Sequence, residues 1–251
     1  MRELLFILPT YNHFEYAELC FNSFARYTPI DRSHVLIVDD ASSKFNLSKV
    51  FDWNACSKSI MRFKQRAGLT RSWNEGLRFA RAHNYNYTIC GNSDLLFTKN
   101  WYTPLKNALN NDYDLVGPVT NAPGHSPWQN INNFINFEPT DDLEILNNCV
   151  DKLKSFKIPQ YVNFINGFFL MAKTSTWWDK PFDSENVFNL KYRLVGNETE
   201  LQNRWKLYNR RIGFVPSSFV FHYRSVSRPE ALIQAASKGW YRNDNSHLHT
   251  V

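Results

Sequence analysis

Cysteine is scarce in this 251-residue sequence, and no motif pairs the few that are present. The 4 cysteines are Cys20, Cys56, Cys90 and Cys149. They form no Cys-x-x-Cys pair and have no zinc-site spacing, which argues against both a disulfide framework and a structural zinc centre. Cys20 and Cys90 lie in apolar segments, so we expect them to be buried thiols.

Long hydrophobic runs are also missing. The first apolar run, at residues 4–8, is far shorter than the roughly 20 residues that cross a bilayer. Arg2 and Glu3 precede it directly and leave no place for a secretory signal. The sequence therefore predicts a cytoplasmic protein without a transmembrane segment, and peripheral contact with a membrane stays open.

Glycine motifs for nucleotides and basic runs for nucleic acids are absent. No Gly-x-Gly-x-x-Gly follows the first apolar run and no Gly-x4-Gly-Lys-Ser/Thr occurs, which disfavours a dinucleotide-binding fold and a P-loop. The net charge is +6, but the 29 lysines and arginines are scattered. Nucleic acid is therefore not an expected partner, whereas a small anionic ligand such as a nucleotide suits the charge.

What the first half does contain is an alternation of strand and helix signals. Strands are expected at residues 4–8, 35–38, 60–63, 87–90 and 115–119, and helices at 14–27, 70–83 and 100–109. This order predicts an α/β fold with a mostly parallel sheet and helices on both faces.

The second half has weaker signals. Residues 121–160 are rich in Asn, Pro and acidic side chains and predict an irregular excursion with one short helix at 142–153. We expect a long strand at 161–172, a helix at 198–209, short strands at 212–215 and 219–222, and a helix at 229–238. No linker separates two units, so residues 1–227 are expected to form one domain, followed by a tail at 228–251.

Polar motifs follow three of the predicted strands directly. They are Pro9-Thr10-Tyr11-Asn12, Asp39-Asp40-Ala41-Ser42 and Asn92-Ser93-Asp94. Each alone is explained equally well by a turn or a helix cap. Open parallel sheets bind ligands at the carboxyl ends of their strands, so the set together favours one shared site.

The combination of these motifs resembles the inverting, metal-dependent glycosyltransferases of family 2, and the resemblance runs from residue 4 to about residue 227. It implies the GT-A fold, which is an α/β fold with a Rossmann-like nucleotide-binding sheet, helices on both faces and a mixed acceptor-side region. Residues 1–120 would form the nucleotide-sugar half and residues 121–227 the acceptor half.

The resemblance assigns a donor-binding set in the first half. It comprises Thr10, Tyr11, Asn12, Asp39, Asp40, Arg71, Asn92, Ser93 and Asp94. In the family, one Asp of the Asp39-Asp40 pair accepts a hydrogen bond from the base; which of the two does so here stays open. A carboxylate suits the imide N–H of uracil or thymine, which favours a UDP- or dTDP-sugar. Arg71, which opens a helix after Gly68, is a candidate for the diphosphate, with a plain surface cation as the alternative.

The same resemblance places a metal site on Asp94 and His222. Asn92-Ser93-Asp94 takes the place of the family's Asp-x-Asp, whose last residue is the metal ligand, although Asn92 replaces the first acid. His222 takes the place of the histidine that completes the site, and a structural histidine is the alternative. Oxygen ligands and a diphosphate suit Mn²⁺ or Mg²⁺.

Glu198 is the candidate catalytic base. Gly196-Asn197-Glu198-Thr199-Glu200-Leu201 resembles the family's Glu-Asp-x-Asp-Leu, with Asn197 and Glu198 in place of its first two acids. A carboxylate there would take the proton of the acceptor hydroxyl; favourable charge at a helix start is the alternative. The implied acceptor-binding residues are Asn166, Gly167, Trp177 and Glu200, with core packing the alternative for Trp177.

The resemblance thus implies transfer of a hexosyl or deoxyhexosyl group, with inversion, from a nucleoside-diphosphate sugar to a hydroxyl acceptor such as a glycan. Two other functions stay open. A sugar-nucleotide-binding protein without transfer is suggested by the altered Asn92 and Asn197. A nucleotidyltransferase would also use Asp and a metal on an α/β sheet, but would release pyrophosphate.

Overall fold

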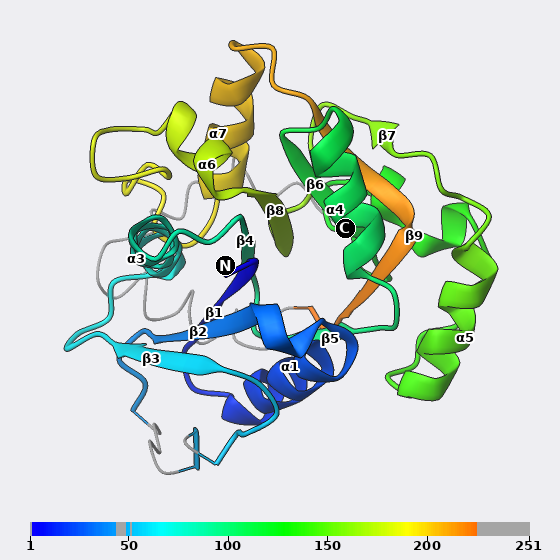
Figure 1. Cartoon of the computed structure of the whole chain (residues 1–251), viewed down its shortest axis with the longest axis horizontal. Coiled ribbons are helices and arrows are strands. Elements are labelled where there is room, and N and C mark those ends of the chain that lie inside the picture. The colour runs from blue at the N-terminus through cyan, green and yellow to red at the C-terminus, as the bar shows by residue number, and fades with distance from the viewer. Residues whose placement is uncertain (1, 44–48, 51, 225–251) are drawn as a thin grey trace, which may run out of the picture.

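The computed structural model describes residues 2–43, 49–50 and 52–224 (Figure 1). The tail expected at 228–251, including its helix at 229–238, lies outside the described residues, as do residues 225–227. The described chain forms a 9-stranded sheet in the order β3-β2-β1-β4-β8-β6-β9-β5, with β7 paired to β9.

The strands of the first half lie where the apolar runs predict them. They are β1 (Leu4–Thr10), β2 (Ser33–Asp39), β3 (Lys58–Arg62), β4 (Tyr87–Gly91) and β6 (Leu115–Val119). Every residue of β1 is buried, as expected for a strand covered on both faces. The run β3-β2-β1-β4 is parallel throughout, which brings the ends of β1, β2 and β4 to one edge.

The mostly parallel sheet that the first half predicts is confirmed in the run β3-β2-β1-β4, but most of the described strand pairs outside this run are antiparallel. Among the described strands, β4–β8, β6–β8, β5–β9 and β7–β9 pair antiparallel, and only β6–β9 adds a parallel pair outside the first run. A buried antiparallel strand has the same continuous apolar sequence as a parallel one, so periodicity does not distinguish them. The α/β class and the mixed character of the second half are confirmed.

Helices cover both faces of the sheet, as predicted (Figure 1). The α1 (Phe14–Tyr27) and α4 (Tyr102–Asn111) helices pack on the face that receives Leu4, Phe6 and Leu8. Leu5 and Ile7 point to the other face, which is covered by α3 (Leu69–Ala82), α5 (Leu143–Leu153), α6 (Thr174–Asp179) and α7 (Asn197–Lys206).

Several elements of the second half differ from the prediction. The long strand expected at 161–172 is replaced by the short β7 (Gln160–Tyr161) and by β8 (Phe169–Lys173), with no strand between them. The two strands expected at 212–222 are one strand, β9 (Ile212–His222), whose pairing with β6 shifts register between Pro118 and Val119. The α6 helix and β5 (Leu95–Phe97) have no counterpart in the prediction, because such short segments carry little periodic signal.

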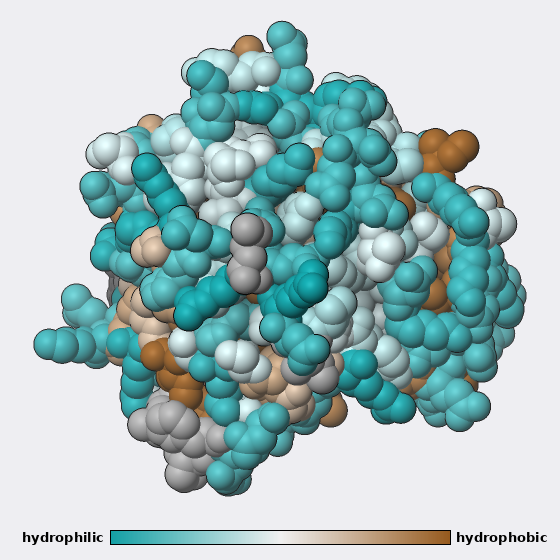
Figure 2. All heavy atoms as spheres, in the orientation of Figure 1, coloured by the Kyte–Doolittle hydropathy of each residue, from teal (hydrophilic) through white to brown (hydrophobic). Residues whose placement is uncertain are grey.

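The surface of the described part is mainly hydrophilic in the view of Figure 2, where hydrophobic residues form scattered small groups. No helix in the described ranges combines the length and apolar character that crossing a membrane requires.

Candidate functional site

The β5 strand brings Asp94 and His222 together. Leu95 of β5 pairs with His222 at the end of β9, and the Tyr223 amide donates to the Asp94 carbonyl at 3.0 Å. The side chains meet with Asp94 Oδ1 at 3.3 Å from His222 Nε2, and both residues are buried, at 8% and 6% exposure. Two residues 128 positions apart, predicted to share one site, are therefore neighbours, because a strand too short to predict pairs their segments.

The imidazole of His222 is held by contacts that the sequence did not signal. The Asn121 side chain accepts from the His222 amide at 2.8 Å and donates to its carbonyl at 3.1 Å. The Phe168 ring stacks on the imidazole at 5.2 Å and 17°. The Asn92 Nδ2 lies 3.3 Å from His222 Nε2, whereas Nδ1 is buried without a hydrogen-bond partner among the described residues. The ring is thus oriented by stacking and by its own backbone, with Nε2 turned toward Asp94.

This pair fits a divalent metal ion. Two ligand atoms about 2.1 Å from an octahedral ion and at a right angle to each other are about 3 Å apart. The distance of 3.3 Å between Asp94 Oδ1 and His222 Nε2 is close to that value. Within the described ranges, no group of three or more His, Cys, Asp and Glu side chains surrounds such a position. The described part of the chain therefore offers two candidate ligand side chains at this position.

Asp39 and Asp40 occupy different environments although they are adjacent. Asp39 has no exposed surface, and its carboxylate accepts from the Ser42 amide, the Ser42 hydroxyl and Arg62, the last at 3.1 Å. Burial raises the pKa of Asp39 above its usual range, although the Ser42 hydrogen bonds and the Arg62 charge act against it. The Asp39 side chain is therefore enclosed and engaged by the protein, and its contact with a sugar donor stays a prediction.

Asp40, in the same turn, is also buried but keeps a small exposed surface. Its oxygens accept from the amides of Ala67 and Gly68 at 2.6 and 3.0 Å, and Arg66 lies 3.7 Å away. Burial raises the pKa of Asp40 too, with the two amides and Arg66 acting in the opposite direction. Asp40 keeps 5% exposure against none for Asp39, and the contact of either carboxylate with a base stays a prediction.

The turn after β1 is tied to the turn after β2. The Asn12 amide donates to the Ser42 hydroxyl at 2.8 Å, and the Thr10 hydroxyl reaches the Asn12 carbonyl at 3.4 Å. Asn12 has a φ of 53°, which Asn tolerates better than most residues. The Tyr11 ring lies under the Arg66 guanidinium at 4.0 Å. The motifs after β1 and β2 therefore form one structure, as their positions predicted.

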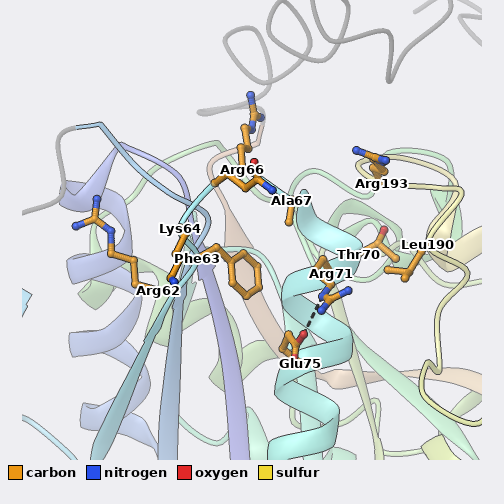
Figure 3. Close-up of a pocket in the computed structure, with 11 residues that line it drawn as sticks. Arg62, Phe63, Lys64, Arg66, Ala67, Thr70, Arg71, Glu75, Leu190 and Arg193 are labelled. Atoms are coloured by element: carbon orange, nitrogen blue, oxygen red, sulfur yellow. Dashed lines mark hydrogen bonds and ion pairs between the residues drawn. The ribbon is translucent and has the colours of Figure 1, made fainter.

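A basic pocket of about 500 Å³ opens between the end of β3, the start of α3 and the 190–193 segment (Figure 3). Its charged lining comprises Arg62, Lys64, Arg66, Arg71, Arg193 and the single acid Glu75. Arg71 is predicted to contact the diphosphate of the sugar donor. In the structure its Nε forms a hydrogen bond with the Glu75 carboxylate at 2.7 Å. The alternation of basic residues at 62, 64 and 66 is a sequence signal that could have indicated this pocket, whereas Arg193 has none.

Glu198 lies in the first turn of α7, beside the segment that leads into β8. A Cβ on Gly167 would come within 2.8 Å of the Glu198 side chain, so only glycine leaves room there. The Gln202 side chain fastens the same segment to α7, because it accepts from the Ile165 amide and donates to the Ile165 carbonyl at 2.8 and 2.9 Å. The structure thus brings Glu198 and Gly167 together.

The other acceptor candidates have varied positions. Trp177 is fully buried in the core against Phe188 and Trp205, which agrees with the core-packing alternative, and a contact with a sugar stays a prediction. The Glu200 carboxylate is bound by Arg204 through two hydrogen bonds at 2.9 and 3.2 Å. Asn166 accepts from the Phe168 amide at 3.1 Å, and its role in acceptor binding, like that of Glu200, stays a prediction.

The sequence matches the model of "Glycosyl transferase family 2" over residues 5–171, which is more than half of the chain. The chain belongs to this family. No curated protein sequence matches it.

Solved structures of glycosyltransferases share its GT-A fold. GalNAc-T7 with UDP, GalNAc and Mn²⁺ superimposes with a TM-score of 0.66 at 16% identity, over 88% of this chain and 44% of that chain. TarS 1-349 of S. aureus gives 0.60 at 16% identity, over 88% and 60%. Mannosyltransferase PcManGT from Pyrobaculum calidifontis, with GDP-Man and Mn²⁺, gives 0.61 at 16% identity, over 95% and 64%. This chain therefore spans less than two thirds of each of these proteins.

Proposed function

We propose that this chain is a glycosyltransferase that moves a hexosyl or deoxyhexosyl group, with inversion, from a UDP- or dTDP-sugar to a hydroxyl of a glycan. The observation that carries the proposal is the approach of Asp94 Oδ1 to His222 Nε2 at 3.3 Å, beside the β-strand edge where the donor motifs lie. Membership of the glycosyltransferase family supports the reaction class.

The donor nucleotide would bind in the basic pocket. Four arginines and a lysine line it, and Asp39, Asp40 and Glu75 lie against three of these five cations. The remaining excess of positive charge suits a diphosphate. The first turn of α3 also lines the pocket, and the amides of a helix start favour an anion. Asp40, rather than Asp39, is the carboxylate within reach of a base imide N–H, which supports a uracil or thymine nucleotide.

Asp94 and His222 would hold Mn²⁺ or Mg²⁺ together with the donor diphosphate. Such an ion, when bound, supplies positive charge that stabilises the leaving nucleoside diphosphate. GalNAc-T7 and PcManGT were both solved with Mn²⁺, which supports the choice of metal.

Glu198 would act as the base. Its carboxylate takes the proton of the acceptor hydroxyl as the acceptor oxygen bonds to the anomeric carbon. The bond from that carbon to the diphosphate oxygen breaks on the opposite side, which inverts the configuration and releases the nucleoside diphosphate. Asn166, Gly167 and Glu200 would border the acceptor, because they flank Glu198 in sequence or in space.

The first test measures binding. Thermal unfolding of the full chain is followed with UDP, dTDP or GDP, each with and without MnCl₂. We expect UDP or dTDP to raise the unfolding temperature and MnCl₂ to increase that shift, because ligands that bind only the folded state stabilise it. A larger shift with GDP would overturn the base preference, and equal shifts with and without MnCl₂ would overturn the metal site.

The second test measures turnover. Release of nucleoside diphosphate from a panel of UDP- and dTDP-sugars is compared in the wild type, Glu198→Gln and the control Glu144→Gln, which alters an exposed glutamate of α5. Loss of the base should slow release by roughly 10²–10⁴-fold, with UDP binding kept. Wild-type turnover by Glu198→Gln would remove that residue from the mechanism. Binding without any turnover would favour a sugar-nucleotide-binding protein, and pyrophosphate release from UTP would favour a nucleotidyltransferase.

A further inference from the structure

The first turn of α3 is connected to the first turn of α7 by a buried polar link. The Asn197 Nδ2 donates to the Thr70 hydroxyl oxygen at 3.0 Å. Thr70 and Asn197 are 0% and 1% exposed, so neither side chain has water as a substitute partner. Thr70 lines the basic pocket, and Figure 3 shows it beside Leu190 and below Arg193. Asn197 directly precedes Glu198 in the sequence.

The proton of the Thr70 hydroxyl already takes part in another hydrogen bond. It donates that proton to the Tyr192 carbonyl, while the Thr70 amide donates to the Arg193 carbonyl at 3.1 Å. A hydroxyl has one proton to donate, so toward Asn197 the Thr70 oxygen acts only as an acceptor. The residue at position 197 must therefore be a donor, which the amide of Asn is and the carboxylate of Asp or Glu is not.

The side-chain oxygen of Asn197 binds the backbone of Glu198. The Glu198 amide donates to Asn197 Oδ1 at 2.9 Å, so one planar amide binds Thr70 with its nitrogen and the Glu198 backbone with its oxygen. The segment before α7 is packed closely against α3 as well: a Cβ on Gly68, which has a φ of 96°, would lie 2.6 Å from the Arg193 carbonyl oxygen.

We propose that Asn197 is a positioning residue that holds the base Glu198 against the donor pocket through Thr70. The inference rests on the proposed function for its kinetic part. It also gives a physical reason for Asn where the family motif has an acid. Because the Thr70 hydroxyl donates its proton to the Tyr192 carbonyl, residue 197 must supply a hydrogen-bond donor, and the side-chain amide of Asn does so. Asn197 is then a specific adaptation of this chain rather than a sign of lost activity.

The kinetic test uses Asn197→Asp, which keeps the shape of the side chain but removes the donor. Its control is Asn203→Asp, the same change at an exposed position of α7. With the UDP- or dTDP-sugar that the wild type turns over, kcat for Asn197→Asp should fall roughly 10–100-fold, because a displaced base works poorly. The KM for the donor and the binding of UDP should change less than about twofold, since the pocket cations stay in place. Thr70→Val should lower kcat like Asn197→Asp, and Thr70→Ser, which retains the hydroxyl, should lose clearly less kcat than Thr70→Val.

A second test needs no turnover. Urea unfolding is measured at pH 8 for Thr70→Val, Asn197→Asp and the double variant. Because the two side chains share one hydrogen bond, the double variant should lose clearly less stability than the two single losses combined. Additive losses would overturn the link, and a folded Asn197→Asp protein with wild-type kcat would overturn the positioning role.

If the wild type turns over no donor, the proposed function fails while the unfolding cycle still decides whether the link exists. A crystal structure of Asn197→Asp then decides positioning, because an unmoved Glu198 over Gly167 would contradict it.

Discussion

Two acidic residues of this molecule, Asp39 and Asp94, lie at or just beyond the ends of strands that finish at one edge of the sheet, and their surroundings differ. Asp39, at the end of β2, is enclosed and accepts hydrogen bonds from Ser42 and Arg62. Asp94, directly before β5, turns its carboxylate toward the His222 imidazole, at a distance suited to a shared metal ion. The Asp39 carboxylate accepts its hydrogen bonds from the protein itself. The Asp94 carboxylate is oriented by its neighbours and keeps the capacity to bind a ligand.

The difference shows why a motif does not by itself assign a role. Both carboxylates follow buried strands, and both were predicted to bind the donor. A carboxylate that accepts several protein hydrogen bonds stabilises its turn, whereas one that faces an imidazole nitrogen keeps acceptor capacity for a ligand. The comparison predicts that Asp94 serves activity and Asp39 serves stability.

The largest expected effect is the loss of activity in Asp94→Ala. Nucleoside-diphosphate release should fall roughly 10³-fold, which corresponds to about 4 kcal/mol of transition-state stabilisation. The free energy of unfolding should change by less than about 1 kcal/mol, because few protein contacts are lost. Activity assays and urea unfolding measure the two effects. Asp112→Ala, which alters an exposed aspartate, is the matched control, and a mainly destabilising Asp94→Ala would break the comparison.

Asp39→Ala should have the reverse pattern. Removal of a buried acceptor takes away the hydrogen bonds of the Ser42 amide and hydroxyl to the carboxylate and the ion pair with Arg62, so the free energy of unfolding should fall by about 2–3 kcal/mol. Urea unfolding measures this loss, and the exposed Asp52→Ala serves as the control. A protein of normal stability that no longer binds UDP would show that Asp39, too, contacts the ligand.

A smaller effect, on Mn²⁺ affinity, is expected when the hydrogen bonds that hold the His222 backbone are removed. Asn121→Ala removes the two hydrogen bonds that fix the His222 backbone, and loss of such supporting contacts typically weakens metal binding about 10-fold or more. Mn²⁺ affinity in the presence of UDP is measured by the electron paramagnetic resonance signal of free Mn²⁺. Asn148→Ala on the surface of α5 should leave the affinity unchanged. Equal affinities in all three proteins would mean that the backbone of His222 needs no such support.

The smallest effect concerns His34 near the amino end of β2, at the opposite end from Asp39. Burial, aided by the charges of Arg2 and His83, lowers the pKa of His34 from 6.5 to about 4, and its ring nitrogens lie near the Ser57 and Ser59 hydroxyls. Between pH 6.5 and 4 the unfolded chain binds a proton that the folded chain does not, so this residue's contribution to stability is lost as the pH falls through that window.

His34→Gln should therefore flatten the fall of the unfolding temperature between pH 6.5 and 4. The raised pKa of Asp39 acts in the other direction, because its folded form binds the proton more readily. The difference between wild type and variant isolates the histidine. Parallel curves for the two proteins would contradict the assignment, and His125→Gln, at an exposed position, is the control.

Much of the first half could be predicted because its signals are local. The apolar run of β1 and the helical spacing of α1 lie within single segments, and the chain order of strand and helix limits the topology. The second half resisted prediction because β5 and α6 are short and β8 pairs antiparallel between β4 and β6. Trp177 shows the same limit of prediction for the site. The sequence names a tryptophan but does not say whether it packs in the core or stacks on a sugar.

The sequence alone determined which chemistry is available: carboxylates after buried strands, an acid at the start of a late helix, and a histidine at the end of the last strand described. It did so because strand ends and helix starts are encoded by neighbouring residues. Only the tertiary structure decided which of these groups are used by the protein and which are presented together. Burial and pairing depend on residues far apart in sequence: Arg62 and Ser42 enclose Asp39, the β5–β9 pair joins Asp94 to His222, and Thr70 determines what residue 197 must be.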